Sequence, residues 1–104
     1  MRRGEVWWAD LPKPVGRRPV LILTRSQAIP IRTSITIAEL TRTIRNIPVE
    51  VKLGPEDGLP KSCVVNLDVI STIPKAVLTE PIASLTPAKL EEVETALKFA
   101  LDLI

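Results

Sequence analysis

The alternation of apolar and polar residues predicts several short β-strands in the first part of the chain. Residues 4–11 read Gly-Glu-Val-Trp-Trp-Ala-Asp-Leu, so a strand here places Trp7 and Trp8 on opposite faces. Residues 34–41 alternate regularly and predict another strand, whereas residues 18–24 form a continuous apolar run typical of a strand covered on both faces. Shorter segments predict strands at 49–53, 63–67, 69–73 and 77–83, with 69–73 either separate or a continuation of 63–67.

The C-terminal segment has the pattern of an amphipathic helix. Thr86 is a favoured N-cap residue, and Pro87 at the first helical position is a favoured start. One face of this helix carries the apolar residues Leu90, Val93, Leu97, Leu101 and Ile104. We therefore expect residues 1–104 to form one mainly β domain with a C-terminal α-helix, in which a small, strongly bent sheet or barrel packs against that helix.

The composition indicates the cellular compartment and excludes some kinds of site. The single cysteine, Cys63, excludes an internal disulfide framework and a thiolate metal site, and it is expected to be a small buried apolar residue. No apolar run approaches the roughly 20 residues needed to span a bilayer, and the N-terminus lacks the apolar stretch of a secretory signal. A cytoplasmic protein without a membrane partner is the natural expectation.

Charge divides the chain into two unlike halves. Residues 1–52 carry ten basic and four acidic side chains, a net +6, whereas residues 53–104 carry four basic and eight acidic side chains, a net −4. All eight arginines lie within the first 45 residues. Because the planar guanidinium matches phosphate in a bidentate manner, this clustering indicates an anionic partner. Charge alone is equally compatible with a solvated basic surface that binds nothing.

The residue types that are missing restrict the chemistry. The chain contains no histidine and no tyrosine, which removes the commonest general base and ordinary zinc sites. No phosphate loop or dinucleotide fingerprint is present, and the acidic residues form no obvious metal-binding cluster, so no cofactor or metal is expected. RNA, however, carries its own nucleophile in the 2′-hydroxyl. Cleavage then requires only orientation of the strand, proton transfer and stabilisation of a charged phosphorane, which arginine and a hydroxyl group can support.

Three segments in order resemble the MazF/PemK family, the toxin component of bacterial toxin–antitoxin pairs. They are Arg3-Gly4-Glu5-Val6-Trp7-Trp8-Ala9-Asp10-Leu11, then Gly16-Arg17-Arg18-Pro19-Val20-Leu21-Ile22-Leu23, then Thr36-Ile37-Ala38-Glu39-Leu40-Thr41 followed by Arg42-Thr43-Ile44-Arg45. Cys63-Val64-Val65-Asn66-Leu67-Asp68 and residues 97–103 fit the later strand and the terminal helix. The match covers nearly the whole chain, and the order and spacing of the motifs carry it.

The resemblance implies an SH3-like barrel, a homodimer, and metal-independent cleavage of single-stranded RNA at short sequences. It also implies two catalytic residues: Arg18 would stabilise charge on the scissile phosphate, and Thr41 would donate to a non-bridging oxygen. The expected products are a 2′,3′-cyclic phosphate and a 5′-hydroxyl end. The cut would block translation by destroying mRNA, or tRNA or rRNA, and an acidic, flexible segment of a cognate antitoxin would occupy the RNA groove. The residues expected to bind RNA around this pair are Arg17, Arg42, Arg45, Asn66 and Asp68.

This chain departs from the family pattern at positions that bear on base recognition. Some members have an arginine where this chain has Asn66, and many have Gln-Ile-Arg where it has Val69-Ile70-Ser71. The loop at 12–17 is also shorter than the usual glycine-rich version. Arg18 and Thr41 are retained, so the resemblance implies the reaction more directly than the RNA sequence that is cut.

Several alternatives follow from the same residues. Arg18 could be a structural arginine paired with Asp10 or Asp68, and Thr41 an ordinary β-branched residue at the end of a strand. At the level of the whole protein, a related toxin of the same fold poisons DNA gyrase without a catalytic Arg–Thr pair. A non-catalytic RNA-binding barrel is a third possibility, although an aromatic content of 3% offers few stacking platforms.

Overall fold

The computed structural model describes residues 1–103 and contains one antiparallel sheet followed by one α-helix. The sheet order is β4-β5-β3-β2-β1-β6, so β4 and β6 are its two edges. The elements are β1 (Glu5–Asp10), β2 (Arg17–Ile22), β3 (Ser34–Thr41), β4 (Glu50–Leu53), β5 (Cys63–Pro74), β6 (Leu78–Ser84) and α1 (Pro87–Ala100), with 3₁₀ turns η1 (Pro55–Asp57) and η2 (Lys75–Val77). The predicted strands are thus all present, within a residue or two at their ends, and the mainly β fold class is confirmed.

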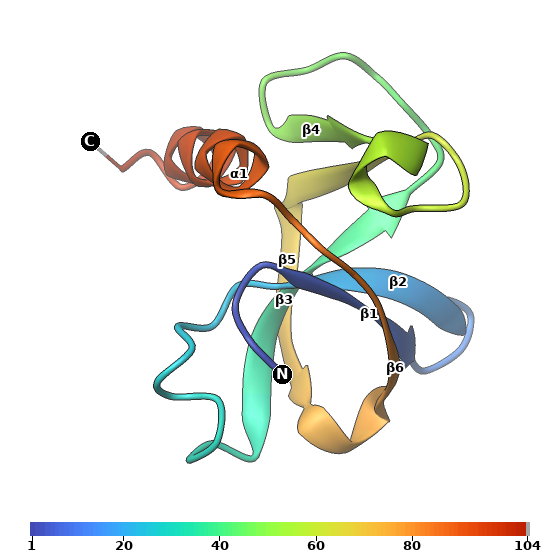
Figure 1. The fold of residues 1–104 in the computed structure, drawn as a ribbon, viewed down its shortest axis with the longest axis vertical. Coiled ribbons are helices and arrows are strands. Elements are labelled where there is room, and N and C mark those ends of the chain that lie inside the picture. The colour runs from blue at the N-terminus through green and yellow to red at the C-terminus, as the bar shows by residue number, and fades with distance from the viewer. Residues whose placement is uncertain (104) are drawn as a thin grey trace.

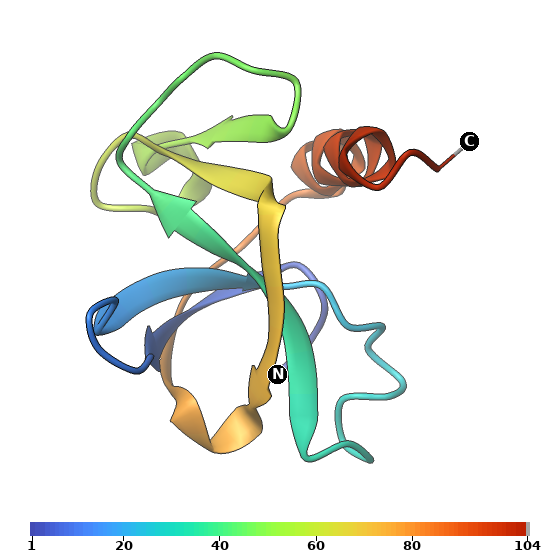
Figure 2. The ribbon, with the colours of Figure 1, turned by 180° about the vertical axis from the view of Figure 1, so that it is seen from behind.

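The sheet curls strongly, as the two opposite views in Figures 1 and 2 show. Its pleat sends alternate side chains of β2 into two different apolar clusters. Val20 and Ile22 join one cluster with Ile35 and Ile37, whereas Leu21 joins the other, which lies under α1 and β4. Val20, Leu21 and Ile22 are all fully buried, which confirms that β2 is covered on both faces.

The long strand β5 changes direction in its middle (Figure 2). Along β3, Ala38 pairs with Ile70, but Leu40, only two residues further on, pairs with Val65. Residues 66–69 of β5 therefore stand opposite Glu39 alone, which is a large bulge of four residues against one. The two segments predicted at 63–67 and 69–73 are one continuous strand with this bend between them.

The helix α1 begins where the sequence predicts. The Thr86 hydroxyl accepts a hydrogen bond from the Lys89 N–H at 3.2 Å, and Pro87 occupies the first helical position. Val93 and Ala96 are buried against the sheet, and Leu90 and Leu97 pack partly against the same cluster.

The end of the predicted apolar face differs from the structure. Leu101 is 48% exposed because the helix ends at Ala100 and the chain then turns away; Ile104 lies outside the described residues. At 14 residues, the α-helix found within residues 1–103 is not long and apolar enough to cross a membrane.

Candidate active site

Arg18 and Thr41 lie on neighbouring strands where the sheet opens. The β2–β3 ladder ends at the pair Val20 and Glu39, and Arg18 and Thr41 each lie two residues beyond that pair, on the same face of their strands as Val20 and Glu39. Residues directly opposite in an antiparallel pair share one face. Both residues therefore extend the face that buries Val20, at the point where the apolar cluster gives way to solvent.

The guanidinium of Arg18 is paired with Glu39. Arg18 Nη1 donates to Glu39 Oε1 at 3.3 Å, with the two side chains 38% and 20% exposed. Asp10 and Asp68, which the sequence offered as alternative structural partners, do not pair with Arg18: Asp10 Oδ1 lies 3.9 Å from Arg17 Nη1, and Asp68 is exposed within the bulge of β5. The pleat of the sheet explains this choice of partner. Arg18 and Glu39 point to the same face of the sheet, whereas Asp10 of β1 lies opposite Arg17 of β2.

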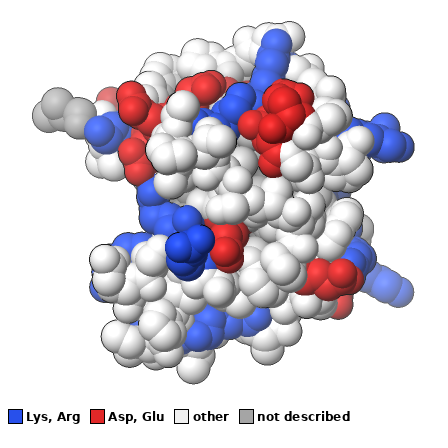
Figure 3. Space-filling model, viewed as in Figure 1, with Lys and Arg blue, Asp and Glu red and all other residues white. Residues whose placement is uncertain are grey.

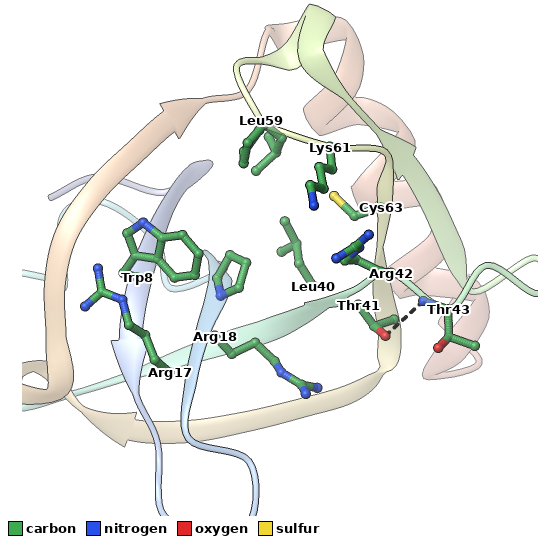
Figure 4. A pocket seen from close by; sticks show the side chains of 12 residues that line it. Trp8, Arg17, Arg18, Leu40, Thr41, Arg42, Thr43, Leu59, Lys61 and Cys63 are labelled. Atoms are coloured by element: carbon green, nitrogen blue, oxygen red, sulfur yellow. Dashed lines mark hydrogen bonds between the residues drawn. The ribbon is translucent and has the colours of Figure 1, made fainter.

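The Thr41 hydroxyl is held by the chain that follows it. Its Oγ1 accepts a hydrogen bond from the Thr43 N–H at 3.2 Å (Figure 4). A hydroxyl carries one donor and two acceptor positions, so accepting this bond does not use its own hydrogen. Thr41 is thus oriented and can still donate to an anionic oxygen.

Two hollows meet at this pair of residues. The first, the apolar hollow, has a volume of about 470 Å³. It is lined by Trp8, Arg17, Arg18, Pro19, Leu40, Thr41, Arg42, Thr43, Leu59, Pro60, Lys61 and Cys63 (Figure 4). The second, the polar hollow, has a volume of about 190 Å³ and is lined by Arg18, Glu39, Thr41, Thr43, Arg45, Asn66 and Val69. Arg18, Thr41 and Thr43 line both, so the predicted catalytic pair lies on the ridge between an apolar and a polar compartment.

The other residues predicted to bind RNA are distributed unevenly around this ridge. Arg42 lines the apolar hollow, and Arg45 and Asn66 line the polar one. Asp68 is exposed and lines neither; its N–H donates to the Asn66 Oδ1 at 2.9 Å, which fixes the bulge of β5. The structure therefore brings Arg42, Arg45 and Asn66 to the site and leaves Asp68 at its margin.

Arg17, which is predicted to bind RNA, lines the apolar hollow and contacts Trp8 and β6. Its guanidinium lies over the Trp8 ring at 4.8 Å from the centroid, a cation–π arrangement. The same group donates to Glu80 Oε1 at 3.0 Å and to the Thr79 hydroxyl at 3.3 Å, both on the edge strand β6. Arg17 thus fixes the indole at the wall of the apolar hollow.

The loop that follows Thr41 is anchored by a carboxylate of β4. Glu50 Oε1 accepts hydrogen bonds from the N–H groups of Arg45, at 3.0 Å, and Asn46, at 2.9 Å. Asn46 adopts a left-handed conformation, φ 57°, which this residue type tolerates well. The anchor sets the position of Arg45 at the polar hollow.

Cys63 is a structural residue. It is 6% exposed, as expected from the sequence, and burial, with a smaller contribution from the charge of Asp57, raises the pKa of its thiol. A protonated thiol is a poor nucleophile. Residues 1–103 hold no group of three or more His, Cys, Asp or Glu side chains arranged to bind a metal ion.

The sequence did not identify Glu39 as part of the site. The alternation of β3 could have indicated this residue, because Ile35, Ile37 and Glu39 occupy successive positions on one face of the strand. An acid that continues a buried apolar series needs a partner, which is Arg18. On the face shown in Figure 3 the basic residues do not form one uniform patch, because acidic side chains lie beside basic ones around a largely uncharged surface.

Comparison with known proteins defines the class to which this fold and site belong. A family model described as "PemK-like, MazF-like toxin of type II toxin-antitoxin system" matches residues 2–101. The chain is 40% identical over 101 residues to "Probable endoribonuclease MazF5" of Mycobacterium tuberculosis (strain ATCC 25618 / H37Rv), covering 96% of this chain and 92% of that protein. It is 42% identical over 93 residues to "Probable endoribonuclease MazF2" of the same strain, covering 88% and 89%.

Solved structures show the same relationship. "Mycobacterium tuberculosis toxin MazF-mt6" superposes with a TM-score of 0.89 at 34% identity, over 96% of this chain and 98% of that one. "Endoribonuclease in complex with its cognate antitoxin from Mycobacterial species" superposes with a TM-score of 0.90 at 35% identity, over 100% and 97%. The chain therefore belongs to the PemK-like, MazF-like toxins of type II toxin–antitoxin systems. The family, fold class and enzyme class predicted from the sequence are confirmed.

Proposed function

We propose that this toxin cleaves single-stranded RNA at short sequences without a metal ion, by attack of a 2′-hydroxyl on the adjoining phosphate. Its class, an endoribonuclease toxin of a type II toxin–antitoxin system, is that of the family to which it belongs. The observation that carries the mechanism is the ridge: Arg18 and Thr41 line both hollows at once. A phosphate bound there would have a nucleoside on each side.

The two ridge residues suit the charge that develops during this reaction. The phosphorane carries negative charge on its non-bridging oxygens, and preorganised donors aimed at that charge lower the barrier. Arg18 supplies a fixed positive charge, and Thr41 supplies a hydroxyl donor whose oxygen is held by the Thr43 N–H. The products would be a 2′,3′-cyclic phosphate and a 5′-hydroxyl end.

The surroundings support a nucleotide on either side of that phosphate. Trp8, Pro19 and Leu59 give the first hollow the apolar walls that a base plane requires. The side chains of Arg42 and Arg45 are exposed, and neither belongs to an ion pair within residues 1–103. Both would contact the RNA backbone, while Asn66 would offer an amide to a base edge.

The assembly and the cellular role belong to the same proposal. The toxin would act in the cytoplasm as a homodimer and stop translation by cutting mRNA, or tRNA or rRNA. A cognate antitoxin would inhibit it by laying an acidic, flexible segment across the ridge, where it would meet the basic residues that otherwise grip RNA. The neighbour solved with its cognate antitoxin supports this partnership.

The test is cleavage of a mixed RNA by the purified protein in EDTA, with mapping of the ends. We expect cuts that persist in EDTA and leave 5′-hydroxyl termini. Arg18→Ala and Thr41→Val should each lower kcat/KM by about 10²–10³-fold, the usual cost of one charge-stabilising donor. Arg25→Ala, an exposed arginine outside both hollows, is the matched control and should cleave normally. Intact RNA together with inhibition of gyrase supercoiling would favour the gyrase-poison alternative instead.

A further inference from the structure

The carboxylate of Glu39 is a group in the site that the proposed mechanism does not yet use. Among the residues that line the two hollows, Glu39 is the sole acid. Its side chain is 20% exposed, and its Oε1 lies 3.3 Å from Arg18 Nη1. The carboxylate thus sits within the site, one hydrogen bond away from the residue that would hold the scissile phosphate.

The backbone around Glu39 makes room for a ligand at this carboxylate. Residues 66–69 of β5 stand opposite Glu39 alone, so the regular ladder is interrupted at this one position of β3. The polar hollow lies at this interruption, with Glu39 and Thr41 contributed by β3 and Asn66 and Val69 by β5. Bulges of this kind recur beside active sites because they redirect side chains and end pairing.

The reaction needs a proton acceptor that the other residues of the site do not provide. A guanidinium keeps its proton under physiological conditions, and a threonine hydroxyl is a weak base. A carboxylate is ionised at neutral pH and accepts protons in many enzymes. Arg18 and Arg45 are the other charged residues that line the polar hollow with Glu39, and the residues that β5 contributes there, Asn66 and Val69, do not titrate.

We propose that Glu39 is the general base of the cleavage reaction; this rests on the ribonuclease function proposed above. The Glu39 carboxylate takes the proton of the attacking 2′-hydroxyl as the O2′–P bond forms. The P–O5′ bond breaks, the leaving 5′-oxygen takes a proton from water of the solvent, and Glu39 returns its proton to solvent. Arg18 is then shared by two anions, holding the base and the scissile phosphate next to each other.

The decisive variant is Glu39→Gln, because the glutamine oxygen can still accept from Arg18 but cannot take a proton. We expect kcat/KM to fall by about 10²–10⁴-fold, the usual contribution of a general base. Affinity for an uncleavable RNA with a 2′-deoxy group at the scissile nucleotide should be unchanged or higher, since a negative charge has been removed. Glu91→Gln, an exposed acid of α1, is the control and should change neither quantity.

One further measurement separates a base from a residue that only positions Arg18, and a second separates a base from a general acid. The wild-type kcat/KM should rise with pH in the acid range and then level off, and this limb should disappear in Glu39→Gln. A substrate with sulfur at the 5′-bridging position needs no proton on its leaving group. A general-acid defect would therefore be relieved by this substrate, whereas the Glu39→Gln defect should persist.

The outcomes distinguish this inference from the function on which it rests. Wild-type protein that leaves RNA intact contradicts the proposed function itself. Wild-type cleavage together with equal or faster cleavage by Glu39→Gln contradicts the base alone, and shows that the ion pair merely restrains Arg18. If Glu39→Gln does not fold, as judged by circular dichroism, the wild-type pH profile still decides, because a profile without an acid limb overturns the proposal.

Discussion

One side chain, Glu50, anchors the loop that carries Arg42 and Arg45. The contribution of this anchor to the local stability of the loop can be predicted quantitatively. Glu50 Oε1 receives the N–H groups of Arg45 and Asn46, at 3.0 and 2.9 Å. A hydrogen bond to a charged group contributes about 1.5–3 kcal/mol, so two such bonds contribute roughly 3 kcal/mol at the lower limit. Exposure of this loop to water reduces the expected local cost of Glu50→Ala to about 2 kcal/mol.

Amide hydrogen exchange measures this cost residue by residue. Since about 1.4 kcal/mol corresponds to a factor of ten, exchange at the Arg45 and Asn46 amides should quicken by roughly 30-fold in Glu50→Ala. Glu50→Gln retains an oxygen acceptor and loses only the charge, so its effect should be about 1 kcal/mol, or roughly fivefold. The buried Glu50 Oε2 has no hydrogen-bond partner within residues 1–103, so its replacement by the amide nitrogen in that variant removes no bond.

The distribution of the effect decides whether the reasoning holds. Amides of β5, such as that of Val65, should exchange as in the wild-type protein, because the anchor is local. RNA cleavage by Glu50→Ala should weaken together with loop protection, since Arg45 loses its fixed position at the polar hollow. Unchanged amide exchange at residues 45 and 46, or exchange that accelerates evenly over β4 and β5, would show that Glu50 does not anchor this loop locally.

Two further predictions concern the first strand. Trp8→Leu keeps an apolar wall in the apolar hollow but removes the aromatic ring. If an RNA base stacks on this ring, the binding free energy measured by fluorescence anisotropy should weaken by about 1–3 kcal/mol. Unchanged affinity would contradict the stacking. Burial raises the pKa of Glu5, but hydrogen bonds from Trp7 Nε1 and the Arg2 N–H, with the nearby positive charges, outweigh it and lower the pKa overall. Glu5 therefore stabilises the fold above its ordinary pKa, and this contribution disappears as the pH falls through the lowered value. Urea unfolding of Glu5→Gln should show the smallest difference from wild type at the acid end; a difference independent of pH would contradict this assignment.

The strands were predictable because each has a strong local pattern. The regular alternation of residues 34–41 gives the bounds of β3 without error, and the apolar run from Val20 gives a strand buried on both faces. The bend of β5 was not predictable, because nothing local distinguishes a break from a bulge near Asn66. That distinction depends on pairing with β3, which is a long-range property.

The candidate site was predictable only in part, and for a similar reason. The order of the motifs identified Arg18 and Thr41, and the structure places both at the same two hollows. The apolar hollow could not be predicted, because Trp8, Leu40 and Leu59 come from segments that meet only after the sheet has curled. The sequence contains a local indication of Glu39, because this acid follows Ile35 and Ile37 on the buried face of β3. Its partner, Arg18, could not be predicted, because that contact depends on how β2 and β3 pair and not on proximity in the sequence.

Arg17 and Arg18 show why a count of arginines cannot locate the chemistry. They are consecutive, so the pleat of β2 sends them to opposite faces. The guanidinium of Arg17 donates hydrogen bonds to Thr79 and Glu80 and lies over the Trp8 ring. These contacts fix one wall of the apolar hollow. Arg18 donates to Glu39 from one nitrogen, at 3.3 Å, while a guanidinium has five N–H donors. Most of its donors therefore remain free for the scissile phosphate of the proposed reaction, and the one that is used holds Glu39, the single acid among the residues that line the two hollows.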